Sequence, residues 1–159
     1  MSGFQVREAR QSDRMVIGRL WLELMEYHRA LDPRFAIAPD GEQKYVRHTL
    51  EMIRSRDARV LVAEETGTGI IVAYVIAELQ RRPPLAQPGL YGFVSDIYVA
   101  EAWRQRGVGR ALVEDLKRWF VLRKASAVEL YIADANPAAT EFWQAMGMTP
   151  FLRLMHMEL

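Results

Sequence analysis

A basic, glycine-spaced segment near the middle of the chain has the residue types of an anion-binding turn. It lies between a β-branched and aromatic run at residues 93–99 and a stretch at residues 107–122 whose apolar residues recur at helical spacing. The first amides of a helix lack intrahelical acceptors, and the helix dipole is positive there. For the glycines alone, a tight turn with solvated arginines is the alternative, but the flanking strand and helix favour a diphosphate site. The residues of this predicted site are Arg104, Gln105, Arg106, Gly107, Val108, Gly109 and Arg110.

The remaining elements place this turn within an α/β chain. Apolar periodicity and turn residues predict strands at residues 4–9, 60–65, 70–79, 93–99, 128–133 and 151–159, and helices at residues 12–30, 40–56, 107–122 and 136–147. A glycine-containing hairpin joins the strands at 60–65 and 70–79, and the second of these alternates too little to have an exposed face, so we expect it to be central. In the second helix, Val46, Leu50 and Ile53 mark the expected buried stripe. The order βααβββαβαβ differs from a Rossmann repeat and from a helix bundle.

Composition narrows the class of protein. The 159 residues are half hydrophobic, which suits one domain with a real core, and the formal net charge of +1 gives no strong field towards nucleic acid or an anionic membrane. The absence of cysteine excludes disulfides, zinc–thiolate sites and a cysteine nucleophile. The histidines are too far apart in sequence for common zinc motifs, so no metal is expected. With no apolar leader and no apolar run of membrane length, we expect a cytoplasmic, soluble protein.

Two blocks of the sequence resemble the GNAT superfamily of acyl-CoA-dependent N-acetyltransferases. The first runs from Asp96 through Val99 to the glycine turn, which is similar to the family's Arg/Gln-x-x-Gly-x-Gly/Ala pyrophosphate loop. The second runs from Asn136 to Met148 and is similar to the family's Asn…Ala…Phe-Tyr…Gly-Phe segment. The likeness extends over the whole chain and is weakest in the first two helices. It implies one α/β (α+β) domain over residues 1–159, with a mixed, mostly antiparallel sheet, a central parallel pair splayed around the cofactor, and helices on both faces.

The resemblance also implies acetyl-CoA (coenzyme A as co-substrate) and assigns residues to it. Three strand residues would pair their backbone with the pantetheine arm: Ile97, Tyr98 and Val99. The turn amides from Gln105 to Arg110 would hold the pyrophosphate. The residues of the last helix that would meet the cofactor are Asn136, Ala139 and Trp143. An Asn-Pro helix start explains Asn136 equally well without any ligand.

Under this resemblance the reaction is direct transfer of an acetyl group to a primary amine of a small molecule, a protein or a peptide. An alkyl amine with a pKa of about 10.4 must first lose a proton, which costs about 4.6 kcal/mol at pH 7, and a carboxylate can accept that proton directly or through water. Asp96 and Glu78 are the candidate bases because each interrupts an apolar strand. By alternation, Asp96 lies on the face opposite Ile97 and Val99, towards the acceptor. An arginine partner or a capping role for Asp96 is an equal alternative.

The sequence departs from the family pattern at the expected proton donor, where Trp143 replaces a tyrosine. An indole N–H is not a useful acid near neutral pH, so we interpret the indole as an aromatic wall beside the cofactor. The thiolate would then take its proton from water or from another tyrosine, with Tyr98 and Tyr131 as candidates, or would leave unassisted. The departure also supports an alternative function, a CoA-binding or sensing domain that has lost catalysis.

The identity of the acceptor is not determined by the sequence. The segment that shapes the acceptor site in this family contains aromatic and acidic residues here, namely Trp21, Tyr27, His28, Asp32 and Phe35. A module for another nucleotide is disfavoured, because the turn lacks the Lys-Ser/Thr ending of a P-loop and the acidic ribose contact of a dinucleotide site. The apolar tail at residues 151–159 is a candidate interface for a homodimer.

Overall fold

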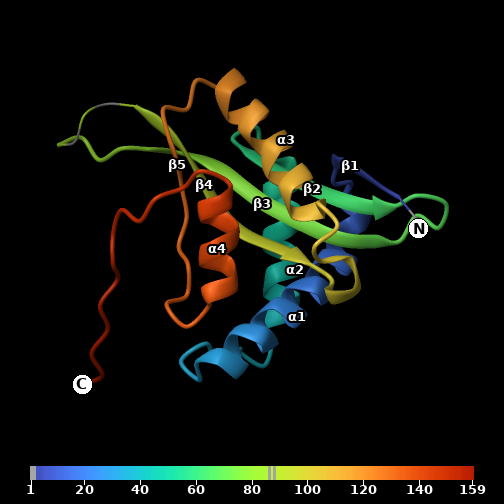
Figure 1. Cartoon of the computed structure of the whole chain (residues 1–159), viewed down its shortest axis with the longest axis horizontal. Coiled ribbons are helices and arrows are strands. Elements are labelled where there is room, and N and C mark those ends of the chain that lie inside the picture. Colours follow the sequence, from blue (N-terminus) through green and yellow to red (C-terminus); the bar gives the residue numbers. More distant parts are fainter. Residues whose placement is uncertain (1–2, 86, 88) are drawn as a thin grey trace.

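A five-stranded sheet in the order β1-β2-β3-β4-β5 forms the centre of the computed structural model, which describes residues 3–85, 87 and 89–159 (Figure 1). Met1, Ser2, Ala86 and Pro88 lie outside the described residues. The elements in chain order are β1 (Phe4–Glu8), the 3-10 helix η1 (Gln11–Asp13), α1 (Arg14–Leu31), α2 (Gly41–Arg54), β2 (Ala58–Glu65), β3 (Ile71–Arg81), β4 (Leu90–Val99), the 3-10 helix η2 (Glu101–Trp103), α3 (Val108–Leu122), β5 (Val128–Glu129) and α4 (Pro137–Ala145). The mixed α/β fold predicted from the sequence is confirmed.

The sheet is antiparallel except at one edge. β1 with β2, β2 with β3 and β3 with β4 form antiparallel pairs, whereas β4 and β5 are parallel. The parallel pair is short, because only Gly92 with Val128 and Phe93 with Glu129 are in register. β4 continues to Val99, so in the described part of the chain its second half has no strand partner on the side away from β3. The splayed parallel pair expected from the sequence is therefore present, but it lies at the edge of the sheet rather than at its centre, because no strand follows β5 in the sheet order.

A β-bulge in β4 lies where the parallel pair separates. Val94 pairs with Ala77 and Asp96 pairs with Ile76, so Ser95 is an extra residue in the ladder. Because the bulge interrupts the alternation, Val94 and Asp96 lie on opposite faces of the sheet although they are two positions apart, as their adjacent partners in β3 do. A bulge bends its strand and increases the local twist, which accounts for the divergence of β4 from β5 at this point.

Two predicted strands differ from the structure. The strand expected at residues 128–133 is reduced to Val128–Glu129, because β4 turns away and leaves the following residues without a ladder partner. The strand expected at residues 151–159 is wrong, because this segment has no assigned secondary structure and its residues are exposed. It runs away from the sheet rather than back along β5 (Figure 1), and an extended segment forms a strand only when its backbone pairs with a neighbour.

Helices cover both faces of the sheet, as predicted. α1 and α2 pack on the face that carries Tyr74 and Tyr98, and α3 and α4 pack on the face that carries Val75 and Ala77. All residues of β3 from Ile71 to Ala77 are buried, so the prediction of a central strand covered on both faces is confirmed. None of the helices among the described residues is long and apolar enough to span a membrane.

The buried stripe of α2 lies one residue away from the predicted one. Tyr45, Thr49 and Met52 are buried, whereas Val46 is only partly buried. Val46 packs closely against α1, where a Cβ added to Gly18 would lie 2.5 Å from the Val46 side chain. α2 thus uses two adjacent stripes, one against α1 and one against the sheet, and the stripe that meets the sheet carries hydroxyl groups.

Candidate active site

The glycine turn joins β4 to α3 through residues with left-handed backbone. Gln105 has a φ of 58°, and Gly107, the N-cap of α3, has a φ of 80°. A Cβ at Gly107 would meet no atom within 4 Å, so the backbone conformation rather than crowding requires glycine there. Gly109 differs, because a Cβ at that position would lie 3.2 Å from the ring of Phe142 in α4. One glycine shapes the turn, and the other lets α4 pack against the first turn of α3.

The start of α3 has the properties of an anion site. Its first amides lack intrahelical acceptors, and its first turn contains no acidic side chain. Gln105, Arg106 and Arg110 are exposed around it, while Val108 is buried and anchors the helix in the core. The guanidinium carbon of Arg106 lies 5.1 Å from the Trp103 ring centroid, which holds this charge beside the turn. A diphosphate suits this combination of free amides and cations.

Arg104 points away from the start of α3 and towards α1. Its Nε donates a hydrogen bond of 3.0 Å to the carbonyl oxygen of Val99 at the end of β4. Its guanidinium carbon lies 5.5 Å from the ring centroid of Tyr98 and 5.7 Å from that of Tyr27 in α1. In this conformation Arg104 links the end of β4 to α1, and the cations nearest the helix start are Arg106 and Arg110.

Asp96 lies partly buried on the face that α1 and α2 cover. Its Oδ2 accepts a hydrogen bond of 2.9 Å from the Tyr45 hydroxyl of α2, and that hydroxyl lies 3.4 Å from the hydroxyl of Tyr74. The Tyr45 ring stacks on Trp21 with centroids 4.6 Å apart. Burial raises the pKa of Asp96, although the Tyr45 hydrogen bond and the nearby histidines act in the opposite direction. In the described residues no arginine donates to Asp96, and its hydrogen-bond partner is a tyrosine.

Two histidines lie near this carboxylate. His28 of α1 stacks on Phe35 with centroids 5.0 Å apart, and burial lowers its pKa while Asp96 partly restores it. The ring centroid of His48 in α2 lies 5.9 Å from that of Tyr45. Among the described residues, no group of three or more His, Asp or Glu side chains is placed to hold a metal ion.

Glu78, the second candidate base, lies two residues along β3 from the partner of Asp96. It pairs with Phe93 in the ladder, and by alternation its side chain is on the same face as Tyr74 and Asp96. Its Oε1 accepts a hydrogen bond of 3.0 Å from the side-chain amide of Gln80. Both candidate carboxylates therefore lie on one face of the sheet, and Asp96 is the one held by a buried hydroxyl.

The two tyrosines considered as proton donors are placed very differently. Tyr98 is buried, and its hydroxyl donates a hydrogen bond of 2.9 Å to Oε2 of Glu23 in α1. Burial and the Glu23 carboxylate raise the pKa of Tyr98. Tyr131 is exposed, and its ring meets that of Phe93 edge-on at 5.4 Å.

Two residues that the sequence analysis assigned to cofactor contact, Asn136 and Trp143, have structural roles at α4. Asn136 is buried and caps the helix, because its Oδ1 accepts a hydrogen bond of 3.1 Å from the amide of Ala139. Trp143 is buried in the core between α3 and α4, with the ring of Phe142 edge-on to it at 5.1 Å. The capping interpretation of Asn136 is confirmed, and the indole of Trp143 is part of the hydrophobic core.

Two residues of this site, Tyr45 and Glu23, were not anticipated from the sequence. Each lies on a helix in the region where the family resemblance is weakest. A hydroxyl group in the apolar periodicity of α2 is the signal that would have identified Tyr45. Glu23 sits one position from the buried Leu24 and carries no comparable signal.

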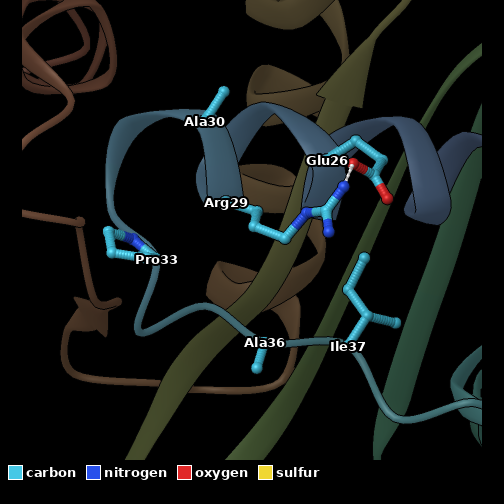
Figure 2. Close-up of a pocket in the computed structure, with 6 residues that line it drawn as sticks. All are labelled: Glu26, Arg29, Ala30, Pro33, Ala36 and Ile37. Carbon is cyan, nitrogen blue, oxygen red and sulfur yellow. Dashed lines mark hydrogen bonds and ion pairs between the residues drawn. The ribbon is translucent and has the colours of Figure 1, made fainter.

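A separate open depression of about 610 Å³ lies at the end of α1 (Figure 2). Its walls come from α1 and from the loop after it, and they comprise Glu26, Arg29, Ala30, Pro33, Ala36 and Ile37. Arg29 and Glu26 form an ion pair at 2.5 Å along one side. None of the predicted catalytic or cofactor-binding residues lines this depression.

Comparison with known proteins places these features in a family. The sequence profile described as the acetyltransferase (GNAT) family matches residues 21–148. No curated protein matches the chain in sequence.

Several solved structures share the fold. A tetramutant of the BH1408 protein from Bacillus halodurans is 25% identical, with a TM-score of 0.87 over 98% of this chain and 99% of that chain. The aminoglycoside N-acetyltransferase AAC(6')-Iy in complex with CoA is 16% identical, with a TM-score of 0.77 over 100% of this chain and 96% of that chain. The aminoglycoside 6'-N-acetyltransferase AAC(6')-Ih from Acinetobacter baumannii is 18% identical, with a TM-score of 0.75 over 99% and 98%. At 16% and 18% identity, the likeness to the two aminoglycoside acetyltransferases shows a shared fold.

Proposed function

The chain belongs to the acetyltransferase (GNAT) family, and from this premise we propose that it is an N-acetyltransferase that moves the acetyl group of acetyl-CoA directly to a primary amine of a small molecule or a peptide. The observation that carries the proposal is the position of Asp96. This carboxylate lies in the half of β4 that pairs with β3 and, among the described residues, has no strand partner on its other side. This half leads into the glycine turn, and a buried tyrosine holds the carboxylate. A single catalytic domain over residues 1–159 is part of the same proposal.

The cofactor site is proposed on the open edge of β4 and the start of α3. Among the described residues, the backbone of Ile97–Val99 has ladder partners on the β3 side only, so its other edge lacks a strand. We place the amide groups of a pantetheine arm along that edge, where the Val99 carbonyl oxygen now accepts a hydrogen bond from Arg104. The amides of residues 105–110, with Arg106 and Arg110, would hold the diphosphate. Acetyl-CoA would supply the acyl group as a thioester.

Asp96 is the proposed general base. An amine nucleophile must lose a proton with a pKa of about 10.4, at a cost of about 4.6 kcal/mol at pH 7. Burial raises the pKa of Asp96 and so reduces the difference between its pKa and that of the amine. The Asp96 carboxylate is therefore a stronger base than an exposed aspartate would be. Tyr45 keeps the ionised carboxylate oriented through its hydrogen bond. Glu78 lies on the same face and is the second candidate.

Water is the proposed proton source for the leaving thiolate. The pKa of Tyr98 is raised, so its hydroxyl is a weaker acid than that of a free tyrosine, and it already donates to Glu23. Trp143 has no acidic proton in this pH range and belongs to the core. A thiolate is a stable enough anion to leave without a strong acid beside it.

Trp143 also favours one second candidate function, an acyl-CoA-binding or sensing domain with little or no catalysis. A binding domain needs the turn and the open edge of β4 but needs neither a base nor an acid. This candidate differs from the proposed enzyme in one measurable respect, which is thiol release.

Calorimetric titration with acetyl-CoA, followed by free-thiol release against a panel of primary amines, tests the proposal. Acetyl-CoA binding together with amine-dependent thiol release is the expected result. Absence of binding would contradict both functions, whereas binding without release for any amine would favour the sensing domain. The panel includes amino sugars, polyamines and peptide amines, and mass spectrometry of the product locates the acetyl group.

A further inference from the structure

Two tyrosine rings at the end of β4 hold a cation of the chain itself. The guanidinium carbon of Arg104 lies 5.5 Å from the ring centroid of Tyr98 and 5.7 Å from that of Tyr27 in α1. The face of an aromatic ring attracts a cation, and here two rings act on the same one. Tyr98 is buried and fixed by its packing, whereas Tyr27 is exposed. The two tyrosines therefore form a place at which a cation binds.

A carboxylate without a cationic partner lies beside these rings. Oε2 of Glu23 in α1 accepts a hydrogen bond of 2.9 Å from the Tyr98 hydroxyl. In the part of the chain that the structure describes, Glu23 forms no ion pair, although Glu26 in the same helix pairs with Arg29. A negative charge next to two ring faces suits an ammonium or guanidinium group. We call Glu23, Tyr27 and Tyr98 the cation subsite.

The cation subsite lies on the same face of the sheet as the proposed base. Asp96 and Tyr98 both point to the face that α1 and α2 cover. Residues two positions apart on a strand are separated by about 6.6 Å. An amine at Asp96 and a second cation in the subsite can therefore belong to one small molecule.

Arg104 is held at the subsite by a backbone contact that the proposed cofactor site also needs. Its Nε donates to the carbonyl oxygen of Val99. Because the amide of Ala100 donates to Val72 in β3, alternation directs the Val99 carbonyl to the opposite edge of β4. We place the pantetheine arm along that edge, so Arg104 and the arm compete for one oxygen. Arg104 is also the first residue of the glycine turn, where a diphosphate would offer it another partner.

We propose that the cation subsite binds a second ammonium group of the acceptor, and that Arg104 fills the subsite only until the cofactor binds. The acceptor class is then a diamine or polyamine, with one amine at Asp96 and another at Glu23 and the two tyrosines. This inference rests on the proposed N-acetyltransferase function and makes its substrate more specific. In the cofactor-free protein Arg104 excludes such an acceptor by position and by charge.

Calorimetric titration with 1,4-diaminobutane tests the subsite without any turnover. The dissociation constant should be at least about fivefold lower for the protein saturated with CoA than for the protein alone. The monoamine 1-aminobutane should bind the CoA complex at least about tenfold more weakly than the diamine, because it lacks the second charge. Equal affinities for the two amines would overturn the inference alone, whereas absence of CoA binding would contradict the proposed function as well.

Variants of the cation subsite test its members one at a time. Glu23→Gln and Tyr27→Leu should each weaken binding of 1,4-diaminobutane to the CoA complex by at least about threefold, whereas Tyr27→Phe keeps the ring and should bind like the parent. The matched control is Glu26→Gln, which removes a neighbouring carboxylate that pairs with Arg29. An equal effect of Glu23→Gln and Glu26→Gln would show unspecific attraction by the acidic side chains and would overturn the subsite. Circular dichroism of each variant verifies folding.

Arg104→Met tests whether this side chain is the displaceable occupant. The variant should bind 1,4-diaminobutane equally well with and without CoA, because the subsite is already vacant. Pantetheine, which has no diphosphate, should bind the variant at least about threefold more tightly than the parent, because the Val99 carbonyl is free. The matched control Arg106→Met removes a cation of the same turn that stacks on Trp103 instead, and it should keep the dependence on saturating CoA. The inference is wrong if Arg104→Met keeps that dependence too.

Discussion

The hydroxyl of Tyr45 donates a hydrogen bond of 2.9 Å to Oδ2 of Asp96 and so joins α2 to the strand that leads into the glycine turn. The two residues are 51 positions apart and come from regions with very different similarity to the family pattern. The strand whose sequence resembles the family pattern thus depends on α2, where that resemblance is weakest, for the orientation of its carboxylate. Substitutions of Asp96 and Tyr45 should therefore change the rate of the proposed reaction and the unfolding free energy to different extents.

Asp96→Asn should reduce kcat by about 10² to 10⁴-fold, the usual contribution of a general base. Acetyl-CoA affinity should be unchanged, since the turn and α3 are untouched. Thiol-release kinetics and calorimetry measure the two quantities, with the exposed Asp57→Asn as the matched control. Full activity with an unchanged pH–rate profile would remove Asp96 from the mechanism and direct attention to Glu78.

The same Asp96→Asn variant should be at least as stable as the parent at neutral pH. The pKa of Asp96 is raised in the folded state, so its ionised form is disfavoured there relative to the unfolded chain. The folded parent therefore gains stability as pH falls through the folded pKa, and the amide removes this penalty at neutral pH. Thermal unfolding should show the difference between the two proteins narrowing at acidic pH. A clear loss of stability in the variant at neutral pH would contradict this account.

Tyr45→Phe should move the acid limb of the pH–rate profile to higher pH. The hydrogen bond favours the ionised carboxylate and lowers the pKa of Asp96, so its removal raises that pKa and delays formation of the base. The unfolding free energy should fall by about 1 kcal/mol. Tyr91→Phe, which removes a hydroxyl bonded to Gln80 instead, is the matched control and should leave the profile in place.

Tyr98→Phe should retain most of kcat, because water rather than this hydroxyl is the proposed proton source. The variant removes the hydrogen bond to Glu23, but this carboxylate is exposed and water replaces the donor, so the unfolding free energy should fall by only about 1 kcal/mol. Stopped-flow thiol release and chemical denaturation measure the two effects. Loss of turnover with full retention of acetyl-CoA binding would assign the acid role to Tyr98.

The two glycines of the turn should respond differently to alanine. Gly107→Ala should lower the unfolding free energy by about 1 to 2 kcal/mol, because the φ of Gly107 is positive. No change in a neighbouring side chain should restore that lost stability. Gly109→Ala places a methyl group 3.2 Å from the Phe142 ring, and the higher helix propensity of alanine, about 1 kcal/mol, offsets the cost of that contact. The net loss should be smaller than at Gly107, and Phe142→Leu should shift the effect of Gly109→Ala towards stabilisation. Denaturant titration of the two single variants and of each paired with Phe142→Leu measures this. Equal rescue at both positions would contradict the separate roles.

Much of the fold and the turn could be predicted from the sequence, because local signals determine them. The buried run of β3, the glycines at φ-positive positions and the Asn136 cap all depend on near neighbours in the chain. The faces of Asp96 and Ile97 also followed from alternation, since both lie after the bulge in β4.

The remaining differences come from long-range packing. The tail has strand-like composition, but only the position of a partner edge decides whether it pairs, and no local pattern contains that information. The sheet-facing stripe of α2 could not be chosen from apolar residues alone, because α2 packs on two neighbours at once. Tyr45 was missed for this reason, and Arg104 was expected at the anion site although its side chain lies between two tyrosines.

The extra residue Ser95 in the β4 ladder determines how well the chain tolerates a one-residue deletion at this position. A strand without it would keep the side chains of Val94 and Asp96 on the faces where they now lie, but its backbone would remain straight and would go on pairing with the residues after Glu129. The gap proposed for the pantetheine arm would then be filled by the protein's own hydrogen bonds. Deletion of Ser95 is therefore expected to give a more regular sheet that no longer binds the proposed cofactor. Ser95 is exposed, yet the chain should tolerate its deletion far less well than that exposure suggests.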